Sequence, residues 1–319
     1  MEIIKTRTIE TLADTMGKDI LGFLNDENVF EIILNSDGKL WLDTFDCGFV
    51  NTGIKLEASQ GKRIIYCVAA LAGVVIDIEK EPYIEADIKE SYLFGKARFQ
   101  GELPTIVDGP SFNWRKHSIK IYTLDDYVNQ GILTNLQYER IIQAIYNHKN
   151  IIAAGGTKSG KTTFLNAILH EISKTKDRII LLEDTPELQC TAENHERLKT
   201  KPPVVDMDML LRITLRKSPN RIVVGEVRGK EALTLLAAWS TGHRGGCLTI
   251  HSESAKDTLY RLEEMVSQIS VTPQQSTIGR AVDIVVYLKY YGGKRKVEEI
   301  IAVKAYDKFK QDYITEKLA

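Results

Sequence analysis

Apolar residues recur along the first third of the chain with the period of a helix and then in shorter runs. Leu12, Met16, Ile20 and Leu24 predict an amphipathic helix over residues 7–24. The apolar run IIYCVAALAGVVI (64–76) predicts a buried helix over about 57–73, because it is shorter than the roughly 20 residues that span a bilayer. The turn residues NSDG (35–38) predict a β-hairpin, and YLFGKARFQGELP (92–104) predicts further strands.

From Asn150 onward, short apolar runs alternate with helical segments. The runs are NIIAA (150–154), DRIILLED (177–184), NRIVVGE (220–226) and GGCLTIH (245–251). Continuous apolar strands that alternate with helices are typical of a mainly parallel sheet covered on both faces, so the fold class is α/β. The last strands are expected to form a hairpin across Gly292 and Gly293.

The stretch between these two regions has no sustained period. Residues 107–134 mix proline, glycine and polar residues, and Thr134 with Gln137 matches a capping box that opens a new helix. We therefore expect an N-terminal α/β domain at 1–115, a linker at 116–134 and a second domain at 135–319.

Composition and charge exclude several classes of protein. The chain has 42 Lys and Arg against 43 Asp and Glu, a formal net charge of −1, which argues against a dedicated nucleic-acid binder. Its four cysteines form no C-x-x-C pair, so reduced thiols are expected rather than disulfides or a cysteine zinc site. The first residues lack the pattern of a signal peptide, so any membrane association is expected to be peripheral.

The sequence GGTKSGKT at residues 155–162 follows a predicted strand and precedes a predicted helix, and it matches the phosphate loop G-x-x-x-x-G-K-[ST]. Backbone N–H groups of such a loop surround the phosphates; Lys161 is expected to reach the β- and γ-phosphates and Thr162 to ligate Mg²⁺. Lys158 is interpreted as a solvated surface lysine. The expected nucleotide-binding residues of the loop are Gly155, Gly156, Thr157, Lys158, Ser159, Gly160, Lys161, Thr162 and Thr163.

Carboxylates follow two of the apolar runs. Glu183 and Asp184 end one predicted strand and Glu226 ends another, and the carboxyl ends of parallel strands meet where α/β folds bind ligands. Two carboxylates at a magnesium–phosphate site can divide the work between holding the metal and orienting the attacking water. A single such residue could equally cap a helix.

Arginines and histidines lie near Glu226 in the sequence. Any of the four arginines could neutralise charge on a γ-phosphate, although an ordinary salt bridge is the alternative for each. His243 and His251 flank the run TGHRGGCLTIH, and no partners at a zinc-binding spacing accompany them. The four arginines are Arg212, Arg216, Arg221 and Arg228.

Together these motifs resemble a known family. GGTKSGKTT, LLEDTPELQ, LRKSPNRIVVGEVRG and AAWSTGHRGGCLTIHS fall in the order of the Walker A, Asp, Walker B and His boxes of the secretion-superfamily traffic ATPases. With EIILNSDGKLW, RFQGELP and WRK upstream, the chain is most similar to the conjugal-transfer members of the VirB11 branch, which serves type IV secretion. The resemblance spans about residues 25–300.

The resemblance implies a RecA-like ATPase domain at 135–319 and a homo-hexameric ring. ATP and Mg²⁺ are the implied cofactors, and inner-membrane components of a secretion or conjugation apparatus are the implied partners. The family acts at the cytoplasmic face of the inner membrane, and no sequence-specific binding of nucleic acid is expected.

By position, the resemblance also implies roles for individual residues. Lys161 and Thr162 hold phosphate and Mg²⁺, Glu183 is the water-activating base, and Glu226 is the Walker B acid that holds Mg²⁺ in part through water. His243 senses the γ-phosphate. Arg98 and Arg115 reach the nucleotide from the N-terminal domain.

Two residue patterns depart from the family. Lys158 replaces the usual glycine, and HSES replaces the commoner HANS after His251. Two other functions remain open: a type II secretion or pilus assembly and retraction ATPase, and a nucleotide-gated scaffold with little turnover. The chain lacks the four-cysteine zinc module of many type II secretion members, which disfavours the first, and both Glu183 and Glu226 are present, which disfavours the second.

Overall fold

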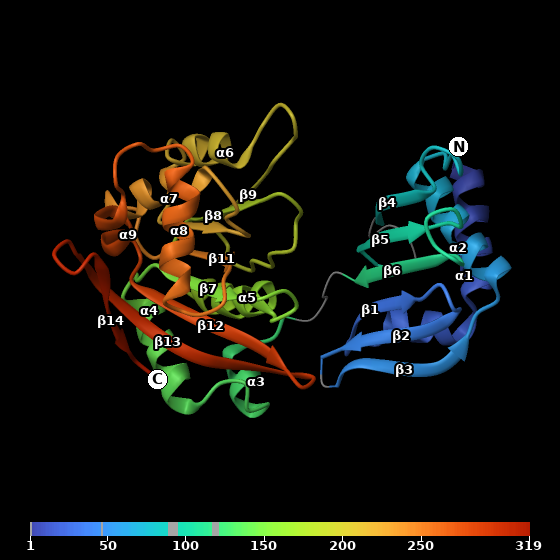
Figure 1. Ribbon diagram of the computed structural model, residues 1–319, viewed down its shortest axis with the longest axis horizontal. Coiled ribbons are helices and arrows are strands. Elements are labelled where there is room, and N and C mark those ends of the chain that lie inside the picture. Colours follow the sequence, from blue (N-terminus) through green and yellow to red (C-terminus); the bar gives the residue numbers. More distant parts are fainter. Residues whose placement is uncertain (1, 46, 89–94, 117–120) are drawn as a thin grey trace. The chain divides into compact units, whose positions relative to one another are not determined.

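The computed structural model describes residues 2–45, 47–88, 95–116 and 121–319 (Figure 1). Its contacts divide the chain into an N-terminal unit, Met1–Lys120, and a C-terminal unit, Ile121–Ala319. None of the described helices is long and apolar enough to cross a bilayer.

The N-terminal unit is a six-stranded antiparallel sheet with two helices packed on one face (Figure 1). The strand order is β3-β2-β1-β6-β5-β4. The elements are α1 (Glu2–Asn25), β1 (Val29–Leu34), β2 (Lys39–Thr44), β3 (Gly48–Lys55), α2 (Ala58–Ala72), β4 (Tyr83–Ile88), β5 (Ala97–Glu102) and β6 (Ser111–Lys116).

The apolar residues that recur with helical spacing in the sequence form the buried face of α1. Leu12, Met16, Ile20 and Leu24 are all buried in a core that α1 shares with α2 and the sheet. The predicted hairpin joins β1 to β2, and Gly38 adopts a φ of 83° in its turn. The first part of the apolar run, residues 64–72, forms the second half of α2. The helix ends at Gly73, which adopts the left-handed conformation that commonly closes helices.

The C-terminal unit is built on an eight-stranded sheet in the order β14-β13-β12-β7-β11-β10-β8-β9. The strands from β12 to β9 pair in parallel, and β13 and β14 add an antiparallel edge. The elements are α3 (Leu124–Asn129), α4 (Asn135–Tyr146), β7 (Ile151–Gly155), α5 (Lys161–Ile172), β8 (Ile179–Glu183), β9 (His195–Lys199), α6 (Met207–Thr214), β10 (Arg221–Val224), α7 (Glu231–Ser240), β11 (Cys247–His251), α8 (Asp257–Ser267), α9 (Gln275–Ala281), β12 (Ile284–Tyr291), β13 (Lys294–Asp307) and β14 (Asp312–Lys317).

The predicted α/β class is confirmed, and the four apolar runs contain β7, β8, β10 and β11. Every residue of β7, β8 and β10 is buried. Because side chains alternate between the faces of a strand, burial of consecutive residues requires cover on both faces. The predicted capping box is also present, with Thr134 and Gln137 exchanging hydrogen bonds at the start of α4.

Residues 107–134, which lack a sequence period, contain regular elements in the structure. β6 lies within them, and α3 lies in the segment assigned to the linker. Tyr127 of α3 is buried, and its ring packs edge-on against Phe164 at 5.4 Å between centroids. Residues 121–134 therefore belong to the C-terminal unit.

Candidate functional site

Four parallel strands bring their carboxyl ends to one edge of the C-terminal sheet. The register pairs His251 of β11 with Gly155 of β7, and Val224 of β10 with Leu182 of β8. Glu183, the next residue of β8, and Glu226, two residues past β10, therefore lie at the same edge as the phosphate loop. This is the edge at which parallel α/β sheets bind ligands.

The phosphate loop leaves β7 with its backbone pressed against β12. A Cβ atom at Gly155 would lie 2.3 Å from the Leu288 carbonyl oxygen and 2.6 Å from Ser159 Oγ. Gly160 adopts a φ of 88° as it starts α5. Both positions therefore require glycine: Gly155 for lack of space and Gly160 for its backbone conformation.

Lys161 begins α5 and turns back over the loop. Its ammonium group donates hydrogen bonds to the carbonyl oxygens of Gly155 (3.0 Å) and Gly156 (2.7 Å), and the residue is buried. Lys158 is exposed and has a φ of 61°, in the left-handed region that glycine occupies at no cost. A glycine would adopt this backbone conformation with less strain than the lysine does.

The rest of the loop is arranged around the start of α5. Ser159 is buried and its hydroxyl donates to the Gly156 carbonyl at 2.9 Å. Thr157 is exposed, whereas Thr162 and Thr163 are half-buried in the first turn of the helix. The helix N-terminus adds its own positive potential to the loop.

Glu183 is buried and held in place from two sides. Its Oε1 atom accepts backbone hydrogen bonds from Glu187 (2.7 Å) and Leu188 (2.6 Å), and its Oε2 atom lies 3.1 Å from Nε of Arg197. Burial raises the pKa of the Glu183 carboxyl, and this effect outweighs the two hydrogen bonds and the arginine, which lower it. Asp184, the next residue, is exposed.

Glu226 lies between two basic side chains. Its Oε2 atom accepts a hydrogen bond from Nε of Arg228 at 2.8 Å, and its Oε1 atom lies 2.6 Å from Nδ1 of His251. Burial raises the pKa of Glu226, but the hydrogen bonds and charges of Arg228 and His251 outweigh burial and lower the pKa. Glu226 is therefore an ionised carboxylate near neutral pH.

The structure does not bring His243 to this edge. His243 precedes β11, whose first residue, Cys247, pairs with Ile151 at the amino end of β7. Since a strand advances about 3.3 Å per residue, roughly 13 Å of β11 separates the two ends. The histidine that the structure brings to Glu226 is His251. The Nδ1 atom of His243 is buried with no hydrogen-bond partner among the described residues.

The four arginines near Glu226 in sequence have separate positions. Arg221 is fully buried and donates to Asp177 at 2.6 Å and to the Gly245 carbonyl at the amino edge of the sheet, which makes it a structural residue. Arg212 pairs with Asp208, and Arg216 is exposed. Only Arg228, among these four, contacts a carboxylate at the candidate site.

Arg98 and Arg115 lie on neighbouring strands of the N-terminal sheet. They are register partners across β5 and β6, with Asp87 and Glu31 as the next residues along the row. Arg115 is exposed and Arg98 is half-buried. Residues in one row share a face, so the two guanidinium groups lie on the same face of that sheet.

Two arginines of the site have no signal in the sequence patterns. Arg197, on β9, forms the ion pair with Glu183 and also donates to the Leu188 carbonyl oxygen. Arg295 reaches the phosphate loop from the β12–β13 hairpin: a Cβ atom at Gly160 would lie 3.1 Å from its Cδ atom, and its guanidinium stacks over Tyr290 at 5.3 Å.

ATP and Mg²⁺ fit the residues of this edge. The Gly155 backbone leaves a bare loop, and the Lys161 ammonium group is held by carbonyl oxygens that phosphate oxygens can replace. Thr162 and Glu226 offer the hard oxygen ligands that Mg²⁺ prefers. The described residues contain no cluster of three or more His, Cys, Asp or Glu side chains that could hold a metal ion.

Known proteins are similar to this chain in sequence. Residues 95–289 match the family described as "Type II/IV secretion system protein". The chain is 41% identical over 302 residues to the probable conjugal transfer protein TrbB of Sinorhizobium fredii, covering 94% of this chain and 91% of that protein. It is 27% identical over 359 residues to the type IV secretion system protein VirB11 of Bartonella henselae, covering 97% of each.

A solved structure has the same architecture. The ATPase DotB of Legionella pneumophila superposes with a TM-score of 0.64 at 18% identity, covering 90% of this chain and 79% of that one. This likeness indicates a shared fold.

The position of Arg295 predicts a contribution to nucleotide affinity. Arg295→Ala is expected to weaken the binding of ATP about tenfold, because a charge-assisted hydrogen bond contributes roughly 1.5–3 kcal/mol and partial exposure reduces it. Titration calorimetry measures the change. Lys296→Ala removes the same charge one residue further, where the strand points to its other face, and should leave affinity unchanged. Equal ATP affinities of the two variants would show that Arg295 makes no specific contribution to nucleotide binding.

Proposed function

We propose that this chain, which belongs to the type II/IV secretion system protein family, hydrolyses ATP to ADP and phosphate and thereby drives a conjugative or type IV secretion apparatus. The observation that carries the proposal is the meeting, at one sheet edge, of the phosphate loop and two buried or half-buried carboxylates, Glu183 and Glu226. A loop alone binds a nucleotide; two carboxylates beside it can also activate water.

The residues of the loop bind the nucleotide. Bound ATP and Mg²⁺ supply the phosphoanhydride bond that breaks and a counter-charge for its oxygens. Lys161 moves from the carbonyl oxygens of Gly155 and Gly156 to the phosphate oxygens, which exchanges neutral acceptors for charged ones and strengthens its hydrogen bonds. Thr162 and Glu226 would hold Mg²⁺.

The two carboxylates have different roles because their surroundings shift their pKa values in opposite directions. Glu183, whose pKa is raised by burial, accepts a proton from the attacking water. The hydrogen bonds from Glu187 and Leu188 fix its orientation. Glu226, whose pKa is lowered by Arg228 and His251, remains ionised through the reaction and is suited to holding Mg²⁺ directly or through water.

The assembly and location of the protein are part of the proposal. By analogy with its VirB11-like relatives, the chain forms a homo-hexamer and acts with inner-membrane components of the apparatus, at the cytoplasmic face of the inner membrane and in peripheral association with it. The formal net charge of −1 supports a protein that does not bind nucleic acid sequence-specifically.

A steady-state ATPase assay on the purified full chain tests hydrolysis. Lys161→Ala is expected to abolish turnover and to weaken ATP binding strongly, because it removes the main point charge of the loop. Lys158→Ala is the matched control: it removes an exposed lysine of the same loop and should retain turnover. Near-normal turnover by Lys161→Ala would contradict the assignment of the loop.

The roles of the two carboxylates are separated by amide substitutions. Glu183→Gln should keep ATP binding and lower kcat about 10²–10⁴-fold, because the amide retains the shape but cannot accept the proton. Glu226→Gln should instead raise the Mg²⁺ concentration needed for activity. Since the pKa of Glu183 is raised, the wild-type kcat should fall with decreasing pH at a pH above the ordinary glutamate pKa of 4.5. A defect in kcat alone for Glu226→Gln, with little effect of Glu183→Gln, would reverse the roles.

We further propose that Arg98 and Arg115 contact the γ-phosphate. Arginine binds phosphate bidentately and keeps its charge, so a contact made only to the γ-phosphate distinguishes ATP from ADP. Arg98→Ala and Arg115→Ala should weaken ATP binding more than ADP binding and slow hydrolysis. Lys80→Ala, an exposed cation of the same unit, is the control. Unchanged affinities for ATP and ADP, together with unchanged turnover, would contradict a contact between these arginines and the γ-phosphate.

A further inference from the structure

The β12–β13 hairpin places an aromatic ring and a guanidinium group together beside the phosphate loop. Tyr290 and Arg295 are register partners on the two strands, and the guanidinium carbon of Arg295 lies 5.3 Å from the centroid of the Tyr290 ring. The aliphatic part of Arg295 also reaches the loop, since a Cβ atom at Gly160 would lie 3.1 Å from its Cδ atom. The stacked pair therefore lies next to the residues proposed to hold phosphate.

The base of the hairpin is fixed on both of its strands. β12 pairs in parallel with β7 up to the pair Leu288 and Gly155, where the phosphate loop begins. On β13, the Val297 backbone N–H donates to the Ile132 carbonyl oxygen at 2.9 Å, and the Val297 carbonyl oxygen accepts from the Gln137 side chain at 3.1 Å. The hairpin is thereby tied both to the strand that carries the loop and to the segment that leads into α4.

The stacked pair lies on the side of the sheet that carries α3 and α5. Burial raises the pKa of Tyr127 of α3 and the charge of Arg295 lowers it, so these two side chains lie near each other. Tyr127 in turn packs edge-on against Phe164 of α5. Because α5 begins at the phosphate loop, Tyr290 and Arg295 lie on the same side of the sheet as the helix terminus that would face the phosphates.

A tyrosine ring and a guanidinium plane match the flat base of a nucleotide. Nucleic-acid bases stack on aromatic side chains and on arginine guanidinium planes. Both Tyr290 and Arg295 are half-buried, so each offers part of its surface to a ligand. In a nucleotide only the ribose separates the base from the α-phosphate, so phosphates held by the loop and the first turn of α5 keep the base close to that helix terminus.

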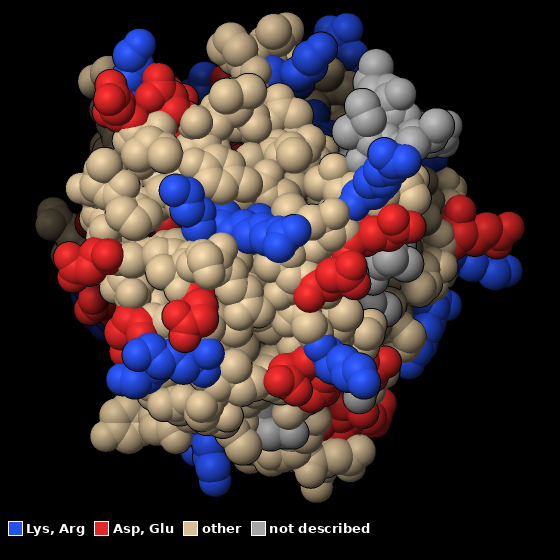
Figure 2. All heavy atoms as spheres, turned by 90° about the vertical axis from the view of Figure 1, so that its right-hand side faces the viewer, with Lys and Arg blue, Asp and Glu red and all other residues tan. Residues whose placement is uncertain are grey.

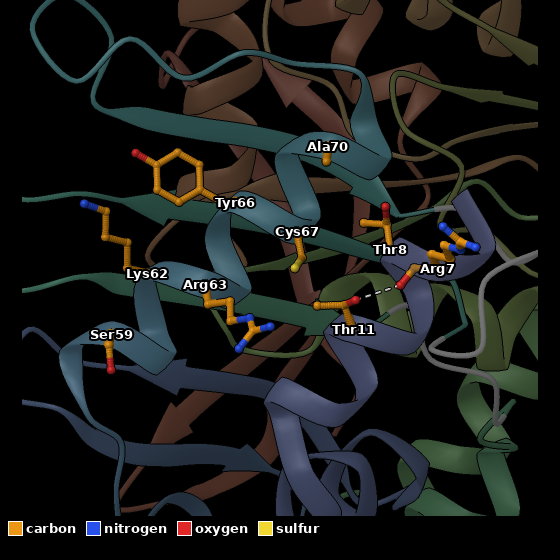
Figure 3. Close-up of a pocket in the computed structure, with 9 residues that line it drawn as sticks. All are labelled: Arg7, Thr8, Thr11, Ser59, Lys62, Arg63, Tyr66, Cys67 and Ala70. Atoms are coloured by element: carbon orange, nitrogen blue, oxygen red, sulfur yellow. Dashed lines mark hydrogen bonds between the residues drawn. The ribbon is translucent and has the colours of Figure 1, made fainter. Parts of the chain in front are cut away.

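A second aromatic–cation pair lies in a groove between α1 and α2, where Lys62 is 5.7 Å from the centroid of the Tyr66 ring (Figure 3). Figure 2 shows the face of the N-terminal unit that these two helices form, with lysine and arginine side chains on a largely uncharged surface. The hydrophobic core of the unit separates this face from Arg98 and Arg115. A nucleotide whose γ-phosphate contacts the two arginines cannot place its base in this groove.

A third aromatic–cation pair lies on α8, where Lys256 is 6.0 Å from the centroid of the Tyr260 ring. Asp312 of β14 accepts hydrogen bonds from both side chains, at 2.6 Å from Lys256 and 2.7 Å from Tyr260. β13 and β12 lie between β14 and β7 in the sheet. Since neighbouring strands are about 4.8 Å apart, roughly 14 Å separates this pair from the strand that carries the loop.

We propose that Tyr290 and Arg295 form the platform on which the base of the bound nucleotide stacks. The proposal rests on the proposed ATPase function and deepens it, because it assigns base recognition to a hairpin outside the phosphate loop. Stacking uses the face of a base and not the hydrogen-bonding groups at its edges, so the platform favours the larger purines over pyrimidines.

Titration calorimetry with the full chain tests the proposal. ADP is compared with inorganic pyrophosphate, which retains two phosphates but has no base, and neither ligand is consumed during the measurement. Tyr290→Ala should weaken ADP binding about tenfold, the usual contribution of one base stacked on an aromatic side chain, and leave pyrophosphate binding unchanged. Tyr290→Phe keeps the ring and should bind ADP as the wild type does. Tyr291→Ala is the matched control, because it removes the neighbouring tyrosine, which is 81% exposed and points to the other face of the strand.

A fluorescent variant gives a second readout. Tyr290→Trp places an indole ring on the platform, and ADP should change its emission whereas pyrophosphate should not. CDP should bind this variant more weakly than ADP does, because a pyrimidine presents a smaller face for stacking. The wild type, whose three tryptophans lie elsewhere in the chain, supplies the baseline.

Three results would overturn the proposal: ADP affinity unchanged by Tyr290→Ala, equal losses of ADP and pyrophosphate affinity in that variant, or a loss of ADP affinity in Tyr66→Ala, which would place the base in the α1–α2 groove. Circular dichroism checks that each variant is folded. If the wild type binds both ligands and Tyr290→Ala binds them equally well, only the platform is disproved. If the wild type binds neither ligand, the proposed ATPase function fails with it.

Discussion

The nucleotide site depends on how closely the phosphate loop passes β12. At Gly155 no Cβ atom fits, because the Leu288 carbonyl oxygen would lie 2.3 Å away. This approach fixes the path by which the loop leaves β7, and with it the positions of the Lys161 ammonium group and the start of α5. It also joins the loop to the β12–β13 hairpin, which extends past the strand end and carries Arg295 to Gly160. One steric contact therefore connects the loop and the C-terminal strands.

Glu183 and Glu226 have similar positions in the sequence, each at the end of an apolar run, but their electrostatic surroundings in the structure differ. Each follows an apolar strand, but Glu183 is enclosed and held by backbone N–H groups, whereas Glu226 is half-buried between Arg228 and His251. The pKa of the first is raised and that of the second is lowered. Carboxylates with pKa values shifted apart are suited to different tasks, one moving a proton and the other keeping its charge.

The sequence predicts the strands and the loop well, because a phosphate loop and buried parallel strands have local signatures. Arg197 and Arg295 could not be predicted, since β9 is an edge strand with no buried residue and Arg295 approaches the loop only through tertiary packing. For His243 and His251, the direction of the predicted strand alone could have shown which of them lies at the carboxyl edge of the sheet. His251 ends its apolar run, as Glu183 does, whereas His243 precedes the same run, so only His251 belongs at the carboxyl edge.

The N-terminal unit places Arg98 and Arg115 on one face of its sheet and both helices on the other. Phe99 and Trp114, register partners on β5 and β6, pack at 5.5 Å in the core that α1 and α2 cover. Because neighbouring residues of a strand point to opposite faces, Arg98 and Arg115 lie on the face of the sheet that these helices do not cover. The outer face of α1 and α2 lies on the other side of this core. A packed hydrophobic layer therefore separates that face from the two arginines, so a phosphate group bound by Arg98 and Arg115 would not touch the helices.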